Sequence, residues 1–170
     1  LDRFIDMFEQ AIAEQKMDEV IKRLEQLTEE QKSITENIKN EDNPDLQALA
    51  SRERRQEEQF KGLEDAMEAA AKAMEELSND AAQQMANLKD SDLTQETKSD
   101  IKSARKNMQN KNKSESEKLA EAAKENLDEM LGKAKKIQEQ FQEDTVDEMM
   151  DAFLAVVRNI LYISQAQEKL

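Results

Sequence analysis

Apolar residues recur at alternating three- and four-residue steps along most of the chain, a spacing that places their side chains on one face of a helix. Residues 1–40 predict a first helix, with an apolar stripe at Phe4, Ile5 and Phe8 and a second stripe from Met17 to Ile38. The two stripes differ in phase. A slip of this kind changes the local supercoil without ending the helix.

The clearest break in the pattern follows the first helix. Asn43 is a favourable N-cap and Pro44 suits the first helical position, so a second helix is predicted over residues 44–89. A short turn of this kind makes the first two helices antiparallel. The second helix has the most regular apolar pattern of the chain, which is typical of bundle or coiled-coil packing. The segment Ser78 to Asp80 could end it early, and both possibilities stay open.

Two polar residues, Glu53 and Gln56, lie on the apolar face of the second helix. Either the helices splay apart here and leave both side chains in water, or the two form a buried polar layer that fixes the helix register. The neighbouring arginines at positions 52, 54 and 55 favour the first interpretation.

The rest of the chain is predicted to form helices over residues 94–109, 114–143 and 145–170. Asp90 to Thr97 is polar enough for a loop, and Gln109 to Lys113 is rich in asparagine, which favours a turn. Ser114 and Glu117 form a capping box at the start of the next helix. The last helix is either a separate element or a phase-shifted continuation of the one before it.

The final segment, Met149 to Leu170, is apolar over most of its circumference. Burying about nine such side chains would contribute on the order of 15–25 kcal/mol, so we expect this segment to be the buried centre of the fold. If it were left uncovered, an apolar face of that size would mark an interface. The candidate contact residues are Phe4, Ile5, Phe8, Phe153, Val157 and Leu161.

Composition narrows the class of protein further. The 170 residues suit one domain, and 38% charged residues with two glycines and one proline are typical of long-helix proteins. The net charge of −14 opposes binding to nucleic acid and to anionic membranes. Without histidine or cysteine, the chain lacks the commonest general base and thiolate chemistry. We therefore expect no catalysis and no cofactor.

Two clusters of charge are candidates for sites. The residues Asp144, Asp147, Glu148 and Asp151 share a helical face, but they lack the glycine-turned loop of calcium sites and the Glu-x-x-His pairs of di-metal bundles. We interpret them as a solvated acidic face or a partner for basic residues. The basic run comprises Lys98, Lys102, Arg105, Lys106, Lys111 and Lys113. It has no interleaved aromatic residues, so we expect it to dock its helix against acidic neighbours.

Several phrases resemble a bacterial family of large membrane-anchored proteins of unknown function, best known from Bacteroidetes. They are Leu27-Thr28-Glu29-Glu30-Gln31, the run from Gln56 to Leu77, Asn107-Met108-Gln109-Asn110-Lys111, and the run from Ile160 to Leu170. The resemblance implies a helical portion of an anchored parent protein and a periplasmic location. The absence of cysteine is equally compatible with the cytoplasm, which is the alternative location. It implies no catalytic residues.

Together these patterns predict an all-α, elongated, mainly antiparallel bundle of four to five helices, forming one domain that is part of a longer protein. The expected function is a non-catalytic structural or protein-interaction module of a cell-envelope protein. Its partner would be another protein or a second copy, with membrane attachment only through flanking segments. The alternative is an amphipathic module that binds lipid or a membrane surface.

Overall fold

The computed structural model describes the backbone of residues 2–167 and the side chains of residues 5–146, 150, 154, 157 and 158. Within these residues all regular structure is helical. The elements are α1 (Asp2–Asn40), α2 (Leu46–Met74), α3 (Asn79–Asp90), α4 (Asp92–Gln109) and α5 (Lys113–Gln167).

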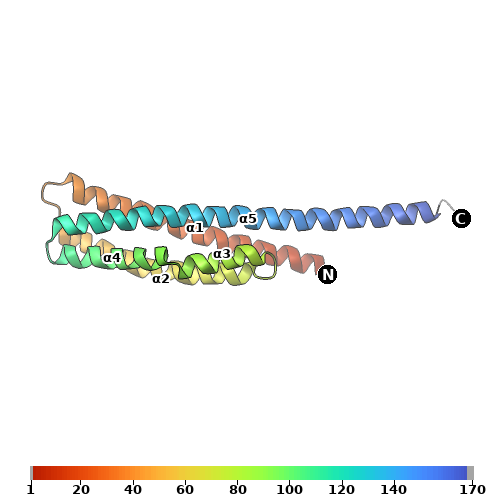
Figure 1. Ribbon diagram of the computed structural model, residues 1–170, viewed down its shortest axis with the longest axis horizontal. Coiled ribbons are helices and arrows are strands. Elements are labelled where there is room, and N and C mark those ends of the chain that lie inside the picture. The colour runs from red at the N-terminus through yellow and green to blue at the C-terminus, as the bar shows by residue number, and fades with distance from the viewer. Residues whose placement is uncertain (1, 168–170) are drawn as a thin grey trace.

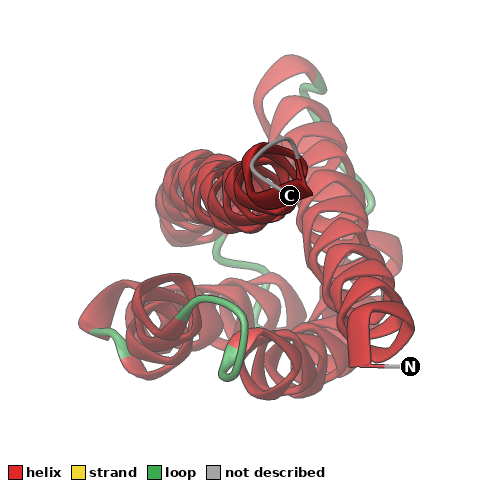
Figure 2. Ribbon diagram, turned by 90° about the vertical axis from the view of Figure 1, so that its right-hand side faces the viewer, coloured by secondary structure: helices red, strands yellow, loops and turns green. Residues whose placement is uncertain are grey.

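The helices form an elongated bundle in which α3 and α4 follow one another along a single line (Figure 1). Viewed along the long axis, α1, α2, the α3–α4 pair and α5 therefore occupy four positions (Figure 2). Neighbouring positions run antiparallel, because each connection reverses the chain except the one between α3 and α4. The predicted all-α, mainly antiparallel bundle is confirmed.

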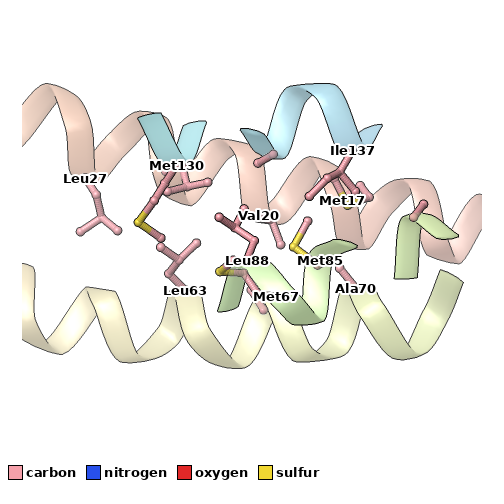
Figure 3. Close-up of a cluster of buried hydrophobic side chains, with 14 of the residues drawn as sticks. Met17, Val20, Leu27, Leu63, Met67, Ala70, Met85, Leu88, Met130 and Ile137 are labelled. Carbon is pink, nitrogen blue, oxygen red and sulfur yellow. The ribbon is translucent and has the colours of Figure 1, made fainter. Parts of the chain in front are cut away.

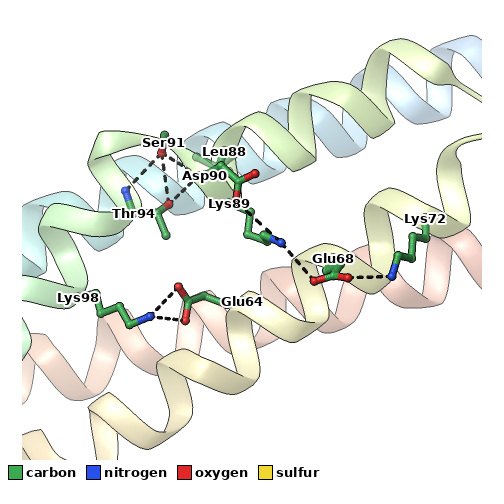
Figure 4. A network of polar contacts seen from close by, with 9 residues as sticks. All are labelled: Glu64, Glu68, Lys72, Leu88, Lys89, Asp90, Ser91, Thr94 and Lys98. Atoms are coloured by element: carbon green, nitrogen blue, oxygen red, sulfur yellow. Dashed lines mark hydrogen bonds and ion pairs between the residues drawn. The ribbon is translucent and has the colours of Figure 1, made fainter.

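The predicted loop from Asp90 to Thr97 is wrong, since Ser91 alone separates α3 from α4. Its hydroxyl donates to the Leu88 carbonyl at 2.7 Å and accepts from the Thr94 backbone N–H at 3.3 Å, so it serves the end of one helix and the start of the next (Figure 4). The Thr94 hydroxyl also donates to the Leu88 carbonyl, at 2.6 Å. Side-chain hydroxyls that satisfy helix ends let one helix end and the next begin within one residue.

The second predicted helix ends early, at Met74, and α3 starts after a short turn. Ser78 caps α3 by accepting from the Ala81 backbone N–H at 3.2 Å. The N-terminal end of α2 also differs from the prediction. Asp45, and not Asn43, is the N-cap, because its carboxylate accepts from the backbone N–H groups of Gln47 and Ala48 at 3.1 and 3.0 Å.

The helix α5 is continuous from Lys113 to Gln167. Of the two possibilities left open, the continuation of the preceding helix is therefore confirmed and the separate helix over residues 145–170 is wrong. Thr145 does not cap a new helix, since its hydroxyl donates back to the Phe141 carbonyl at 3.0 Å. At the other end of α5 the cap is Asn112, which accepts from the Glu115 backbone N–H at 3.3 Å, and not Ser114. The predicted turn before it is confirmed, with Lys111 at a φ of 59°.

The main core comes from the apolar seams of α1, α2, α3 and α5, with Ile101 from α4. Buried methionines and aliphatic side chains interdigitate there, as Figure 3 shows for Met17, Val20, Met67, Met85 and Met130. A second, smaller core lies toward the α1–α2 turn and comprises Ile34, Ile38, Leu49, Ala50, Ala104, Met108 and Ala120. The fold therefore depends on seams spread over the whole chain.

The final segment is not the buried centre that its composition predicts. Beyond Thr145, α5 runs past the α2–α3 turn and past the start of α1 (Figure 1). Among its described side chains, Met150 is 55% exposed and Leu154 is 41% exposed. Most of this segment's side chains lie outside the described residues. The expectation of burial is wrong for the apolar side chains at positions 150 and 154.

The basic run docks α4 against α2, as its position in the sequence predicts. The Lys98 ammonium lies 2.8 Å from the Glu64 carboxylate (Figure 4), and the Arg105 guanidinium pairs with Glu57. The four side chains are 19–42% exposed, and ion pairs near the surface contribute no more than about 1 kcal/mol each, so these pairs orient α4 more than they stabilise it.

Candidate interaction surface

The hairpin between α2 and α3 marks the end of the covered part of the bundle. At this turn the Ser78 hydroxyl donates to the Asp144 carboxylate of α5. The last buried positions lie at the same level, Phe141 and Thr145 on α5 and Ala13 on α1. Past this point α2 and α3 no longer contribute a layer, and α1 and α5 continue alone (Figure 1).

Apolar side chains persist on both helices where the covering layer stops. Within the described part of the chain, the exposed large hydrophobic residues are Ile5, Met7, Phe8, Ile12, Val146, Met150 and Leu154. All of them belong to α1 before Ala13 or to α5 after Thr145; we call them the overhang surface. Phe8, with 68% of its surface exposed, is the most accessible. Clustering of this kind at one end of a molecule is typical of an interaction site.

The overhang surface is rotated away from the buried seams. On α1, Ile12 precedes the buried Ala13 by one residue, and on α5, Val146 follows the buried Thr145 by one residue. One residue turns a helix by about 100°, so these stripes point beside the core and not into it. On α1, this rotation is the consequence of the difference in phase between the two apolar stripes that the sequence shows.

The sequence-predicted contact residues are partly located by the structure. Ile5 and Phe8 are exposed, and Val157 is half-buried. The side chains of Phe4, Phe153 and Leu161 lie outside the described residues. Sequence reasoning missed Met7, Ile12, Val146, Met150 and Leu154. The signal for two of these was present in the final segment, where Met150 and Leu154 form a second apolar row that was interpreted as part of the buried face.

A second notable cluster is a polar layer inside the bundle, which contradicts the favoured interpretation of a splayed, wet end. Gln31, Glu53 and Gln56 are all fully buried. The Gln31 amide donates to the Glu53 carboxylate at 2.7 Å, and the Gln56 amide donates to Gln31 Oε1 at 3.2 Å and to the Leu27 carbonyl at 2.8 Å. The layer separates the main core from the second core.

The polar layer has unsatisfied acceptors and a shifted carboxyl group. Glu53 Oε2 and Gln56 Oε1 are buried without a hydrogen-bond partner. Burial raises the pKa of Glu53 to about 8, against the opposing effect of the hydrogen bond from Gln31. At the edge of the layer, the hydrogen bond from Arg52 lowers the pKa of Glu30. Glu53 is therefore a neutral carboxylic acid at pH values below about 8.

The acidic face on α5 is only partly described. Asp144 accepts from the Gln140 amide of the same helix at 2.7 Å and from the Ser78 hydroxyl, and the second contact joins α5 to the α2–α3 turn. Among the residues whose side chains are described, no group of three or more acidic, histidine or cysteine residues is arranged to hold a metal ion. Over the same part of the chain, no helix combines the length and the apolar character needed to span a membrane.

Comparison with known proteins adds no relative: no family model, curated protein or solved structure matches this sequence.

Proposed function

We propose that this chain is a non-catalytic helical interaction module and that its overhang surface contacts a partner protein. The observation that carries the proposal is the gathering of seven exposed apolar side chains beyond the α2–α3 turn. Burial of a fully exposed side chain of this kind contributes about 1.5–3 kcal/mol. These seven side chains are 37–68% exposed, so a partner that covers them gains a part of that contribution at each position. Placement in a bacterial cell-envelope protein belongs to the same proposal and is supported only by the sequence resemblance.

The test compares three proteins. The first is the unaltered chain, the second carries Phe8→Gln, Met150→Gln and Leu154→Gln on the overhang surface, and the third is a control with exposed positions changed at the opposite end. The control substitutions are Ala48→Gln, Ser114→Gln and Lys118→Gln. Each protein is tested by light scattering and crosslinking for self-association, by fluorescence anisotropy with a panel of amphipathic helical peptides, and by flotation with vesicles.

The proposal predicts that the unaltered chain binds a helix, either a peptide or a second copy, and that the overhang variant loses this binding while the control keeps it. A chain that stays monomeric and binds none of the peptides would overturn the proposal. Binding to zwitterionic or anionic vesicles alone would also overturn it, in favour of the lipid-binding alternative.

A further inference from the structure

The two cores of the bundle differ in size and in position. The second core lies at the end of the bundle where the α1–α2 and α4–α5 turns lie side by side, and we call this end the turn end (Figure 1). Among the described side chains, the second core has seven buried residues, three of them alanine, whereas the main core has twenty-two. Opening the turn end therefore exposes much less apolar surface than unfolding the whole bundle, and partial openings of this kind require less free energy.

The polar layer between the two cores is hydrogen-bonded within one hairpin only. Gln31 belongs to α1, Glu53 and Gln56 belong to α2, and their hydrogen bonds join these two helices. Among the described side chains, no hydrogen bond joins the layer to α4 or α5. Glu53 Oε2 and Gln56 Oε1 have no partner. The α1–α2 hairpin can therefore keep every hydrogen bond of the layer if α4 and α5 move away.

The two opposite helices, α4 and α5, pass from one core to the other through small or aliphatic side chains. On α4 the buried positions change from Ile101 in the main core to Ala104 in the second core, and on α5 they change from Ala123 to Ala120. These side chains offer no donor to the two unpartnered oxygens. Water that enters between the hairpins would supply donors to both, so opening removes a cost that the closed bundle carries.

The polar contacts that join the two hairpins at the turn end lie at the surface. The Lys39 ammonium lies 2.6 Å from the Glu121 carboxylate, and the Lys113 ammonium donates to the Glu41 carbonyl at 2.8 Å. The Lys39 side chain is 44% exposed, and pairs this accessible contribute little to stability and are screened by salt. The small second core is therefore the main obstacle to opening.

The surroundings of Glu53 oppose its ionisation in the closed bundle. Burial is the largest cause of its raised pKa and outweighs the hydrogen bond from Gln31, which acts in the opposite direction. Glu57 and Glu30 also raise the pKa of Glu53, and Arg52 lowers it. The Arg52 guanidinium is already paired with Glu30 at 2.7 Å. Among the described side chains, no ion pair involves Glu53.

The charged side chains of α4 and α5 near the layer are engaged at the surface. The charged residues directly next to the three alanines of α4 and α5 are Arg105, Glu121 and Lys124, and each of them is in an ion pair. Lys102 and Lys106, also on α4, are exposed. Ionisation of Glu53 in the closed bundle therefore leaves a buried charge without an ion-pair partner, and opening allows water to hydrate it.

From the divided core, the polar layer bonded within one hairpin and the small side chains opposite it, we infer that the turn end is a pH-sensitive switch. When Glu53 ionises, the α4–α5 hairpin separates there from the α1–α2 hairpin, while the main core stays folded. The open form exposes the apolar side chains of the second core and brings the Glu53 carboxylate into water. The switch lies at the end of the bundle opposite the overhang surface and does not rest on the proposed function.

The direction of the pH dependence follows from the two environments of Glu53. Its carboxyl ionises near pH 4.5 in water and near pH 8 in the closed bundle. The open form therefore binds fewer protons between these values, and the equilibrium constant for opening rises with pH, by about 100-fold from pH 6 to pH 9. Below pH 4.5 the carboxyl is neutral in both forms and has no effect on opening.

Thiol labelling compares the two cores, since the chain has no cysteine. One variant carries Ala120→Cys in the second core and the other carries Ala134→Cys in the main core; both alanines lie on α5 and are 0% exposed. Each is made with Glu53 and with Glu53→Gln, and labelling is measured in dilute solution from pH 6 to pH 9. Each rate is divided by the rate of the same thiol in denaturant at the same pH, which corrects for ionisation of the thiol.

We expect the relative rate at position 120 to exceed that at position 134 by at least about tenfold and to rise by about 100-fold between pH 6 and pH 9. With Glu53→Gln this rise should disappear. Low concentrations of urea should accelerate labelling at position 134 more than at position 120, because local opening exposes less surface. Equal relative rates at the two positions, or a rise at position 120 that persists with Glu53→Gln, would overturn the inference.

Discussion

The Gln31 side-chain amide donates to the Glu53 carboxylate at 2.7 Å, between α1 and α2 and out of contact with water. This hydrogen bond lies where two apolar cores meet, so sliding α1 along α2 would place a polar group against aliphatic side chains. The cost of an unpartnered buried polar group is about 1–3 kcal/mol, which makes the alternative registers unfavourable. The polar layer therefore specifies how the two helices align.

The raised pKa of Glu53 makes stability depend on pH in a definite direction. The carboxyl ionises near pH 4.5 in the unfolded chain but near pH 8 in the folded protein. Its contribution to stability is thus fully present below pH 4.5 and is lost as the pH rises through 8. Between pH 6 and pH 9 we expect the free energy of unfolding to fall by about 2–3 kcal/mol from this group. Urea denaturation across this range measures the slope.

The control for this dependence is Glu53→Gln, which keeps the shape and an acceptor for Gln31 but does not titrate. The free energy of unfolding of Glu53→Gln should change little between pH 6 and pH 9. Since that of the unaltered protein falls over the same range, the stability of the variant relative to the unaltered protein should rise with pH. Carboxylates whose pKa is lowered by ion pairs, such as Glu30, stay ionised above pH 6 and affect both proteins equally. Parallel curves for the two proteins would show that Glu53 does not titrate in this window.

Removing one member of the polar layer should cost more than removing all of it. Gln31→Ala takes the donor from Glu53 and the acceptor from Gln56, and we expect a loss of about 2–4 kcal/mol in the free energy of unfolding. Replacing Gln31, Glu53 and Gln56 together with leucine should be neutral or stabilising by about 1–4 kcal/mol, because the two cores then merge. Denaturant unfolding of both variants measures the two changes in the free energy of unfolding. A triple variant less stable than Gln31→Ala would contradict this account of the layer.

The Ser91 hydroxyl forms hydrogen bonds with both α3 and α4, so its removal should destabilise the end of one helix and the start of the other. Ser91→Ala loses the acceptor for the Thr94 N–H and the donor to the Leu88 carbonyl. We expect destabilisation by about 1–2 kcal/mol, as for other helix caps. Ser91→Asp retains the N-cap acceptor and is the matched control, expected to recover part of the loss. Thermal unfolding compares the three proteins, and an unchanged midpoint for Ser91→Ala would refute the dual role.

The two glycines lie inside helices and differ in what a methyl group would meet. Around Gly132 on α5 there is nothing within 4 Å of an added Cβ, so Gly132→Ala should stabilise the protein by about 1 kcal/mol. At Gly62 on α2 the added atom would lie 3.0 Å from a guanidinium nitrogen of Arg23, at the end of a flexible side chain. Gly62→Ala should therefore gain less, because Arg23 has to move. If denaturant unfolding gives the same increase in the free energy of unfolding for both variants, the contact between the added methyl group at position 62 and Arg23 has no effect on stability.

The regular parts of the fold could be predicted from the sequence because they depend on local patterns. The three-four spacing of α2 and the Asn-rich turn before α5 each determine their structure within a few residues. The docking of Lys98 and Arg105 against acidic neighbours was also predictable, since the basic run of α4 is visible in the sequence.

The rest depended on information that a local pattern does not contain. Hydropathy shows that the stripe at Val146, Met150 and Leu154 is apolar, but the length of α2 and α3 decides whether it is covered. The end of α2 and the start of α3 depend on the turn at Ser78, which caps α3. From the sequence alone, the helix could equally have continued through this position. The polar layer was misjudged for a related reason. Glu53 and Gln56 look solvated beside three arginines, and only the pairing with Gln31 on another helix makes their burial acceptable.

Thiol labelling of single-cysteine variants tests the central claim, the uncovered overhang, most directly, because the chain has no cysteine of its own. The variants are Leu154→Cys on the overhang surface and Ile137→Cys on the buried face of the same helix. The native Ile137 is 4% exposed. In dilute solution we predict that the thiol at position 154 reacts within about tenfold of the rate in denaturant. The thiol at position 137 should be slower by on the order of 10³ or more, since it reacts only after local or global opening. Equal protection of the two thiols would contradict the account, because the end of α5 would then be covered by its own chain.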